Sequence, residues 1–285
     1  MSDLSRANEL LDAAARVVES PRPMAEGEPV YCGLDVGTAF MVLAAVDGAG
    51  EPVGCAFEFA DVVRDGMVVD YVGACDIARR LHDRLSSQLG VELGPCAVAL
   101  PPGTGALDGG AVKNVAQSCG LDVVAVLDEP TAANLVVGAT DAAVVDIGGG
   151  TTGVSVFSGG AVVAVADEST GGTHFSLVLA GARHISFEEA ERYKRDPRHH
   201  GELLPVVRPV IDKVASIVSR AIAGHPVEEV VLVGGTSELA GIEGVLEKDL
   251  GLPCAKPVHP MFATPLGLAL GCLETAGQEV PGHGR

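Results

Sequence analysis

Two short stretches of the sequence place an aspartate directly before a glycine turn that also carries threonine. They read GLDVGT (residues 33–38) and VVDIGGGTTG (residues 144–153). A turn with few Cβ atoms lets successive backbone N–H groups face one concave side, where a phosphate can approach closely. The threonine hydroxyls add neutral donors. These residues therefore favour phosphate binding, with ordinary hairpin turns that need positive φ as the alternative.

Asp35 and Asp146, the two aspartates before the turns, would repel a bound phosphate. A divalent cation between carboxylate and phosphate removes this conflict. Mg²⁺ usually keeps several of its waters and therefore suits carboxylates that hold it through those waters. We expect Asp35 and Asp146 on the metal side of a magnesium-phosphate site.

The composition limits the classes of function. With 285 residues the chain is long enough for two lobes, and hydrophobic residues at 47% with aromatics at 4% indicate a Val, Ala, Leu and Ile core, which is typical of buried parallel sheets. A formal net charge of -19 argues against nucleic acid and membrane surfaces as partners. The scattered cysteines, 7 in number, show no CxxC spacing and indicate a reduced compartment, so the expected location is cytoplasmic.

The order of predicted elements is that of layered α/β lobes. Residues 2–20 place apolar side chains at helical spacing, with Ser2 or Ser5 as the cap, and a Pro-rich linker follows, so this helix is expected to be tethered ahead of the first strand. Strands and helices then alternate, including a helix over 237–250. The apolar face of the first helix is formed by Leu4, Ala7, Leu11, Ala14 and Val18.

The opening pattern of strand, glycine turn and strand returns at residue 141, which predicts an internal duplication. We expect a two-lobed α/β fold with a cleft between the lobes. The predicted boundaries are a helix and linker over 1–29, a first lobe over 30–139, a second lobe over 140–264, a helix over 265–276 that returns to the first lobe, and a flexible tail over 277–285.

The sequence resembles the superfamily of actin, hexokinase and the DnaK-type heat-shock chaperones. Five segments match in order: the phosphate loops GLDVGT (33–38) and VVDIGGGTTG (144–153), the interlobe connections LDEPTAA (127–133) and TPLGLALG (264–271), and the adenosine segment VVLVGGTS (230–237). The resemblance implies a duplicated, ribonuclease-H-like, actin-like ATPase fold with ATP or ADP and Mg²⁺ in the cleft.

The resemblance also implies roles for individual residues. Asp35 and Asp146 become the metal-side carboxylates, and the expected catalytic positions are Asp35, Glu129, Asp146 and Thr151. Glu191 and Lys194 match residues that reach ribose and adenine, with a surface ion pair as the alternative. The expected nucleotide contacts are Gly37, Thr38, Gly148, Gly149, Gly150, Thr151, Thr152, Glu191, Lys194, Gly234 and Gly235.

Several features depart from the DnaK pattern. An acidic residue expected two positions after the second-loop threonine is Gly153 here, and residues 30–100 contain no lysine for the catalytic position. Phosphoryl transfer depends on such charges, so we expect at most a slow ATPase. The chain also ends after the ATPase core, which argues against client handling by the DnaK route. His199 and His200 are expected to be exposed.

Within the superfamily, segments such as DEPTAAN and ADESTGGTHFSLVLAG resemble ethanolamine utilization proteins of a bacterial microcompartment. This resemblance implies an accessory or chaperone-like role with a microcompartment enzyme or shell protein as partner. The first helix either docks on such a partner or packs on its own lobe. A filament or scaffold protein is the alternative function, and a small-molecule kinase ranks below it.

Overall fold

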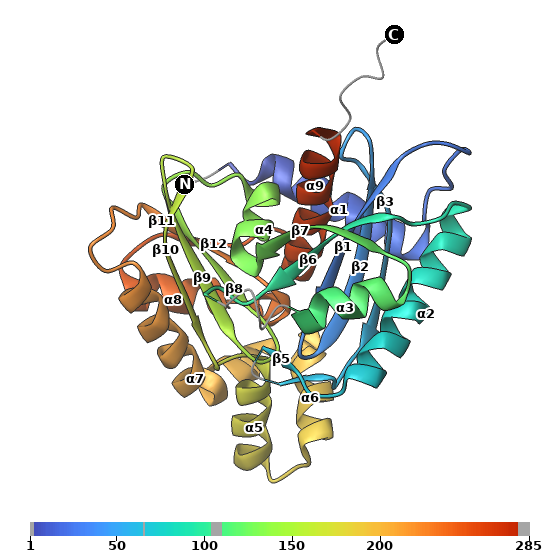
Figure 1. The fold of residues 1–285 in the computed structure, drawn as a ribbon. Helices are drawn as coiled ribbons and strands as arrows, with labels where there is room; N and C mark the ends of the chain where they lie inside the picture. The colour runs from blue at the N-terminus through green and yellow to red at the C-terminus, as the bar shows by residue number, and fades with distance from the viewer. Residues whose placement is uncertain (1–2, 65, 104–109, 279–285) are drawn as a thin grey trace.

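The computed structural model describes residues 3–64, 66–103 and 110–278, and its two lobes each contain a five-stranded sheet (Figure 1). The first sheet has the strand order β3-β2-β1-β6-β7. Its strands β1, β2 and β3 pair antiparallel, and β6 and β7 extend the sheet in parallel from β1. The strands are β1 (Val30–Val36), β2 (Phe40–Asp47), β3 (Pro52–Phe59), β6 (Pro95–Leu100) and β7 (Asp122–Asp128).

The second sheet repeats this order as β10-β9-β8-β11-β12. Here β8, β9 and β10 pair antiparallel, and β11 and β12 extend the sheet in parallel from β8. The predicted duplication is therefore confirmed strand by strand. The strands are β8 (Ala142–Ile147), β9 (Thr152–Ser158), β10 (Ala161–Glu168), β11 (Glu229–Val233) and β12 (Cys254–Ala255).

Helices cover the outer faces of both sheets. On the first lobe, α2 (Tyr71–Leu89) and α3 (Gly110–Ser118) pack on the sheet, next to the small hairpin of β4 (Val63–Arg64) and β5 (Met67–Val68). On the second lobe, the apolar faces of the helices complete a core of Val, Leu and Ile. These helices are α5 (Gly172–Arg183), α6 (Phe187–Arg195), α7 (His200–Ala221) and α8 (Ile242–Leu250), with the short 3-10 turn η1 (Pro197–His199) before α7.

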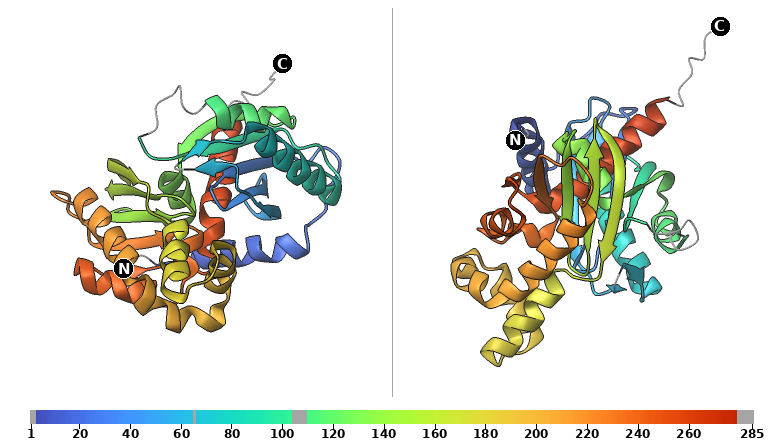
Figure 2. Two further views of the ribbon diagram at one scale, coloured as in Figure 1. Left: turned by 90° about the horizontal axis from the view of Figure 1, so that it is seen from below. Right: turned by 90° about the vertical axis from the view of Figure 1, so that its left-hand side faces the viewer.

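The two interlobe connections cross between the sheets, where α4 (Glu129–Val137) packs against α9 (Ala263–Gln278) (Figure 2). The two helices approach closely because the residues at their contact are small. A Cβ atom at Gly267 would lie 1.9 Å from the carbonyl oxygen of Ala132, and one at Gly33 of β1 would lie 2.3 Å from that of Pro265. The α9 helix therefore packs on the first sheet as well as on α4.

The first helix, α1 (Ser5–Glu19), is built into the protein instead of being tethered ahead of it, which corrects the prediction. It contacts β3, α4 and the 3-10 turn η3 (Pro260–Phe262) that leads into α9. Asn8 accepts a hydrogen bond at 2.9 Å from the backbone N–H of Val258 in the same connection. The buried side chains are Ala7, Leu10, Leu11, Ala14 and Val17.

Three smaller predictions also need correction or limitation. The N-cap of α1 is Leu4, and the Ser5 N–H donates a hydrogen bond to the Asp3 carboxylate at 2.9 Å, while Ser2 lies outside the described residues. The helix predicted over 237–250 is divided into η2 (Gly235–Glu238) and α8, because Gly241 between them has a φ of 88°. The predicted tail begins inside α9, and its residues 279–285 lie outside the described part.

No helix in the described part of the chain is both long and apolar enough to cross a membrane.

Candidate functional site

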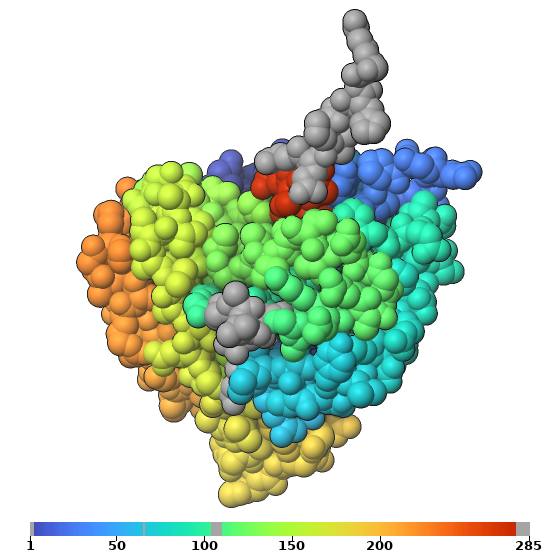
Figure 3. All heavy atoms as spheres, viewed as in Figure 1, coloured from blue at the N-terminus to red at the C-terminus, as the bar shows by residue number. Residues whose placement is uncertain are grey.

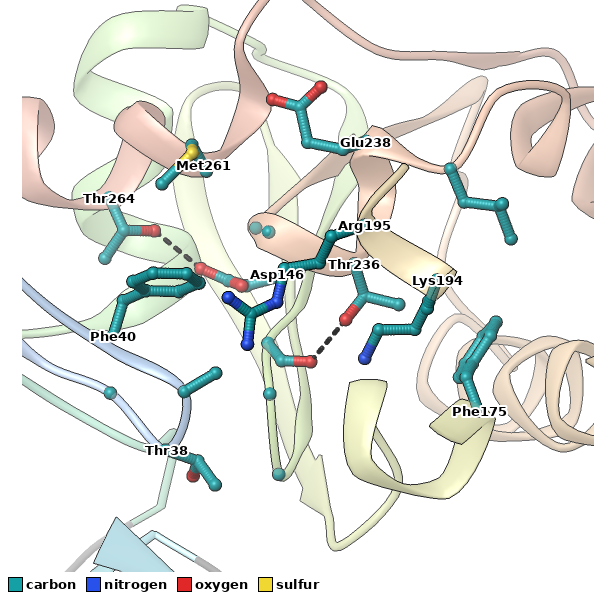
Figure 4. Close-up of a pocket in the computed structure, with 18 of the residues that line it drawn as sticks. Thr38, Phe40, Asp146, Phe175, Lys194, Arg195, Thr236, Glu238, Met261 and Thr264 are labelled. Atoms are coloured by element: carbon teal, nitrogen blue, oxygen red, sulfur yellow. Dashed lines mark hydrogen bonds between the residues drawn. The ribbon is translucent and has the colours of Figure 1, made fainter. Parts of the chain in front are cut away.

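A pocket of about 550 Å³ opens between the lobes where β1 and β8 end at their glycine turns (Figure 4). Both turns contribute to its wall, together with residues of α4, α6, η2 and η3. The structure thus brings together residues that lie far apart in the sequence. The predicted site residues in the wall are Asp35, Gly37, Thr38, Glu129, Asp146, Gly148, Gly149, Gly150, Thr151, Glu191, Lys194, Gly234 and Gly235.

The two glycine turns have the same internal hydrogen bond. The Gly37 N–H donates to the carbonyl oxygen of Phe40 at 3.1 Å, and the Gly148 N–H donates to that of Thr151 at 3.0 Å. In each turn the aspartate two residues earlier lies on the same side, because a Cβ atom on either glycine would be 4.0 Å from its Oδ1. The duplication therefore extends from the strand order to the geometry of the turns.

Gly149 and Gly150 are required by a close approach of the two turns. A Cβ atom at Gly149 would lie 2.9 Å from the Cβ of Ala39, and one at Gly150 would lie 2.6 Å from the Oγ1 of Thr38. Neither glycine has a positive φ, so the alternative of an ordinary turn with positive φ does not explain them. The first turn lies directly against the second across the floor of the pocket.

The carbonyl groups of the second turn are held by neighbouring elements. The Gly172 and Thr173 N–H groups of α5 donate to the carbonyl oxygens of Gly148 and Gly149, at 2.9 and 2.7 Å. The Thr236 hydroxyl also donates to the Gly148 oxygen at 2.7 Å (Figure 4). These bonds fix the conformation of the turn before any ligand is present.

Thr152 does not line the pocket, which corrects its assignment as a phosphate contact. Its side chain is buried, and its hydroxyl donates to the carbonyl oxygen of Thr170 at 2.5 Å. The side chain of a strand alternates between the two faces of the sheet, so two successive threonines cannot both face the pocket. Thr151 does, and Thr152 instead anchors the segment before α5.

Three carboxyl groups share the polar end of the pocket. Burial, with repulsion from Asp146, raises the pKa of Asp35 from 3.8 to about 7, and burial raises that of Asp146 to about 6. Burial also raises the pKa of Glu129, and both aspartates raise it further. The Thr264 hydroxyl donates a hydrogen bond to the Asp146 carboxylate at 2.5 Å, and this bond opposes the increase in the pKa of Asp146.

These carboxyl groups fit a magnesium ion held through water. Within the described residues, no three side chains of His, Cys, Asp and Glu stand close enough to bind a metal directly, and no ion pair joins a cation to Asp35, Glu129 or Asp146. Buried carboxyl groups that repel one another are stabilised as anions by a divalent cation. A hydrated ion can reach them across a longer distance than a directly bound metal.

Gly234 was expected next to the adenosine, but its main constraint comes from Asp146. Its φ is 86°, and a Cβ atom there would lie 2.1 Å from Oδ1 of Asp146. Gly235 is less confined, since its Cβ position lies 3.9 Å from Met261. Both glycines line the pocket, and only the first is needed to make room for the carboxylate.

Glu191 and Lys194 form a largely buried pair, so the alternative of a surface ion pair is wrong. Their side chains are 12% and 14% exposed, and Nζ lies 2.8 Å from Oε2. Nζ also donates to the carbonyl oxygen of Gly172 at 2.8 Å, and the Ser176 hydroxyl donates to Glu191 at 2.5 Å. Burial lowers the pKa of Lys194, partly offset by Glu191.

Arg195 and Phe40 are pocket residues that the sequence analysis did not identify. The guanidinium of Arg195, on α6 of the second lobe, lies 5.0 Å from the ring centre of Phe40 and 4.9 Å from that of Phe59 in the first lobe. Such cation-π contacts are attractive. At the surface, the yellow atoms of the second lobe adjoin the cyan part of the first lobe (Figure 3). The only available sequence signal was the position of Arg195 beside Lys194.

His200 is buried, contrary to the expectation for the histidine pair. Its Nδ1 accepts a hydrogen bond from the Ala240 N–H at 3.1 Å, and burial lowers its pKa. His199 stacks on Tyr193 with ring centres 3.7 Å apart. The two residues therefore support the second lobe, and His200 also reaches the pocket wall.

Comparison with known proteins identifies first the fold of this chain and then its family. The family model of the MreB/Mbl protein matches residues 56–180, and that of the cell division protein FtsA matches residues 143–267. The solved structure of MreB5 of Spiroplasma citri bound to ADP has a TM-score of 0.70 at 18% identity, covering 88% of this chain and 98% of that chain. The chain therefore has the actin-like ATPase fold.

Two further relatives are much more similar in sequence. The ethanolamine utilization protein EutJ of Escherichia coli (strain K12) is 44% identical over 255 residues, which are 89% of this chain and 90% of the relative. The crystal structure of EutJ from Carboxydothermus hydrogenoformans has a TM-score of 0.88 at 43% identity, covering 94% of this chain and 99% of that chain. The chain belongs to the EutJ family of ethanolamine utilization proteins.

Proposed function

We propose that this chain binds ATP or ADP with Mg²⁺ between its lobes and acts as an accessory or chaperone-like protein in ethanolamine utilization. The observation that carries the proposal is that two equivalent glycine turns, each preceded by an aspartate, meet at one pocket. The description of an MreB5 structure of the same fold as bound to ADP, and of another as bound to AMPPNP, supports a nucleotide as the ligand.

In this proposal the groups around the pocket bind different parts of the nucleotide and its metal ion. The turn amides, including that of Thr151, and the hydroxyl of Thr38 donate to the phosphates, and Asp35, Asp146 and Glu129 hold the waters of the ion. Mg²⁺, when bound, supplies the positive charge that lets these carboxylates face a phosphate. Glu191 and Lys194 contact the ribose and adenine, beside Gly234 and Gly235.

Nucleotide binding then favours one arrangement of the lobes. The phosphates contact turns from both lobes, so occupancy shifts the population toward the arrangement in which both turns reach them. A change in lobe position alters the surface presented to a microcompartment enzyme or shell protein. The name of the relatives supports ethanolamine utilization as the context in which such a partner would be found.

Hydrolysis is expected to be slow. The pocket-lining lysine and arginine of the described residues, Lys194 and Arg195, both lie on α6, and Lys194 is held in its pair with Glu191. The described residues of the first lobe therefore bring no lysine or arginine to the pocket, and less charge is available to stabilise phosphoryl transfer.

Calorimetric titration with ATP and Mg²⁺ tests the site. We expect saturable binding that weakens about tenfold or more in Lys194→Met, since a charge-assisted contact is worth about 1.5–3 kcal/mol. Lys248→Met, which removes an exposed lysine on α8, is the matched control and should bind as the wild type does. Absence of saturable binding by the wild type, or unchanged binding by Lys194→Met, refutes the site.

A filament or scaffold function is the second candidate. The matches of the cell-shape and cell-division family models to residues 56–180 and 143–267 favour it. It uses the same nucleotide pocket, and differs in requiring that copies of the chain associate.

A further inference from the structure

Asp167 on β10 lies in the same row of the second sheet as Asp146. The central residue of this row is Gly153 on β9, which pairs with Asp146 of β8 on one side and with Asp167 of β10 on the other. Directly opposite residues of a sheet point to the same face. Two carboxyl groups therefore flank a position that has no side chain.

The space above Gly153 is occupied by the first lobe. A Cβ atom at Gly153 would lie 3.2 Å from Pro102 and 3.3 Å from Pro130, so a longer side chain at this position would meet both prolines. A carboxylate can approach the second turn from the neighbouring strand, where Asp167 stands.

Asp167 interacts with Thr151 and leaves one oxygen atom without a partner. In the register of β9 with β10, Thr151 stands two residues before Gly153, so it is a diagonal neighbour of Asp167 on the same face. A side-chain hydrogen bond to Thr151 lowers the pKa of Asp167, while Oδ1 of Asp167 is buried and makes no hydrogen bond. Burial, opposed by this bond to Thr151, raises the pKa of Asp167 to about 6. A buried carboxylate oxygen without a donor is costly, so packing alone does not account for this residue.

Thr151 also borders a second, smaller cavity of about 20 Å³ beside the main pocket. Gly37, Thr38, Glu129 and Thr151 line both spaces. A cavity needs about 10–15 Å³ and at least two polar partners to hold one water. The hydroxyls of Thr38 and Thr151 and the carboxyl group of Glu129 provide such partners next to the turns proposed to hold the phosphates.

We infer that Asp167 is a positioning residue for nucleotide hydrolysis, acting through Thr151; the inference rests on the proposed function. Asp167 accepts the Thr151 hydroxyl proton, which leaves the oxygen of that hydroxyl free to accept a hydrogen bond from a water in the small cavity.

The hydrolytic step then balances. The water oxygen forms a bond to the terminal phosphorus while the bond from that phosphorus to the bridging oxygen of ADP breaks. The water proton passes to Thr151, whose own proton passes to Asp167, and the products are ADP and inorganic phosphate.

Steady-state hydrolysis of ATP with Mg²⁺ by Asp167→Asn tests this role. We expect kcat to fall about tenfold or more, since positioned proton acceptors typically contribute about 10²–10⁴-fold, with KM and the Kd of ADP within about twofold of the wild type. Asp167→Glu should recover part of kcat. Glu168→Gln, which changes the adjacent acidic residue paired with Lys213 and Arg220 at the surface, is the control and should keep the wild-type kcat.

A double-mutant comparison separates this role from general support of the sheet. Thr151→Val should lower kcat, and adding Asp167→Asn should lower it no further, because both changes interrupt one path. Unchanged kcat in Asp167→Asn, additive effects, or equal losses in kcat and ADP affinity overturn the inference. If Asp167→Asn does not fold, the kcat values of Thr151→Val and Asp167→Glu test the inference in its place.

Wild-type protein that binds ATP without hydrolysing it also overturns the inference, but it leaves the proposed function standing. Wild-type protein that does not bind ATP contradicts both the inference and the proposed function.

Discussion

At the scale of single residues, the carboxyl groups of the pocket make folding depend on pH. Asp35 and Asp146 have pKa values of about 7 and about 6 in the folded protein, against 3.8 ordinarily, chiefly because they are buried. Between pH 4 and 7 these two carboxyl groups therefore bind more protons in the folded chain than in the unfolded chain. The free energy of unfolding decreases with rising pH wherever this is so.

Metal-free protein should accordingly lose thermal stability as the pH rises from about 4 to about 7, through the interval between unfolded and folded pKa values. Thermal unfolding followed by circular dichroism in a chelating buffer would measure this. The Asp35→Asn variant should show a smaller decrease, and added Mg²⁺ should reduce the decrease in the wild type. A Tm that rises steadily over this interval in both proteins would contradict the raised pKa values.

The sequence predicted the residues that belong to a local motif and missed those that depend on strand pairing. Asp35 and the glycines of both turns could be identified because the turn itself carries the pattern. Asp167 could not, because its place beside the second turn follows from the register of β10 with β9. Thr152 was misassigned for a related reason, since neighbouring strand residues face opposite sides.

At the scale of elements, α1 joins the edge strand of the first sheet to the connection that leaves the second. Its apolar side chains share one cluster with residues of β2, α4, β8 and η3. The sequence predicted the helix and most of its apolar face, whereas the surface that the face covers is assembled from distant segments. The structure therefore favours packing on the protein itself over docking on a partner.

The Leu11→Ala variant measures how firmly α1 is held. Leu11 is 0% exposed, and such a truncation should lower the free energy of unfolding by about 2–5 kcal/mol. Leu177→Ala is a control on an exposed helical leucine, 53% exposed, and should change stability by about 0.5 kcal/mol or less. Urea unfolding would compare the two, and equal small effects would indicate a helix that is free to leave its site.

At the scale of the whole molecule, two similar lobes are joined by the crossing of α4 and α9. The apolar runs and the repeated turn predicted this duplication, and the comparisons confirm the actin-like fold. The contacts between the lobes could not be predicted from the sequence, because Arg195 contacts Phe40 and Phe59 only in the folded arrangement of both lobes.

The overall charge bears on whether copies of the chain associate. A net charge of -19 opposes self-association, so we expect the protein to stay in the supernatant when centrifuged with ATP and Mg²⁺. Centrifugation of the protein with ADP and Mg²⁺ is the control. Pelleting that depends on ATP would instead support the filament or scaffold function.

The close approach of the two turns has a kinetic consequence. Gly149 and Gly150 lie against Ala39 and Thr38, so we expect that a triphosphate bound between the turns has to separate them first. Association should then follow the rate at which the turns separate and level off at high ligand concentration. For the same reason, the lifetime of the complex would be governed by the frequency of that opening rather than by the number of phosphate contacts.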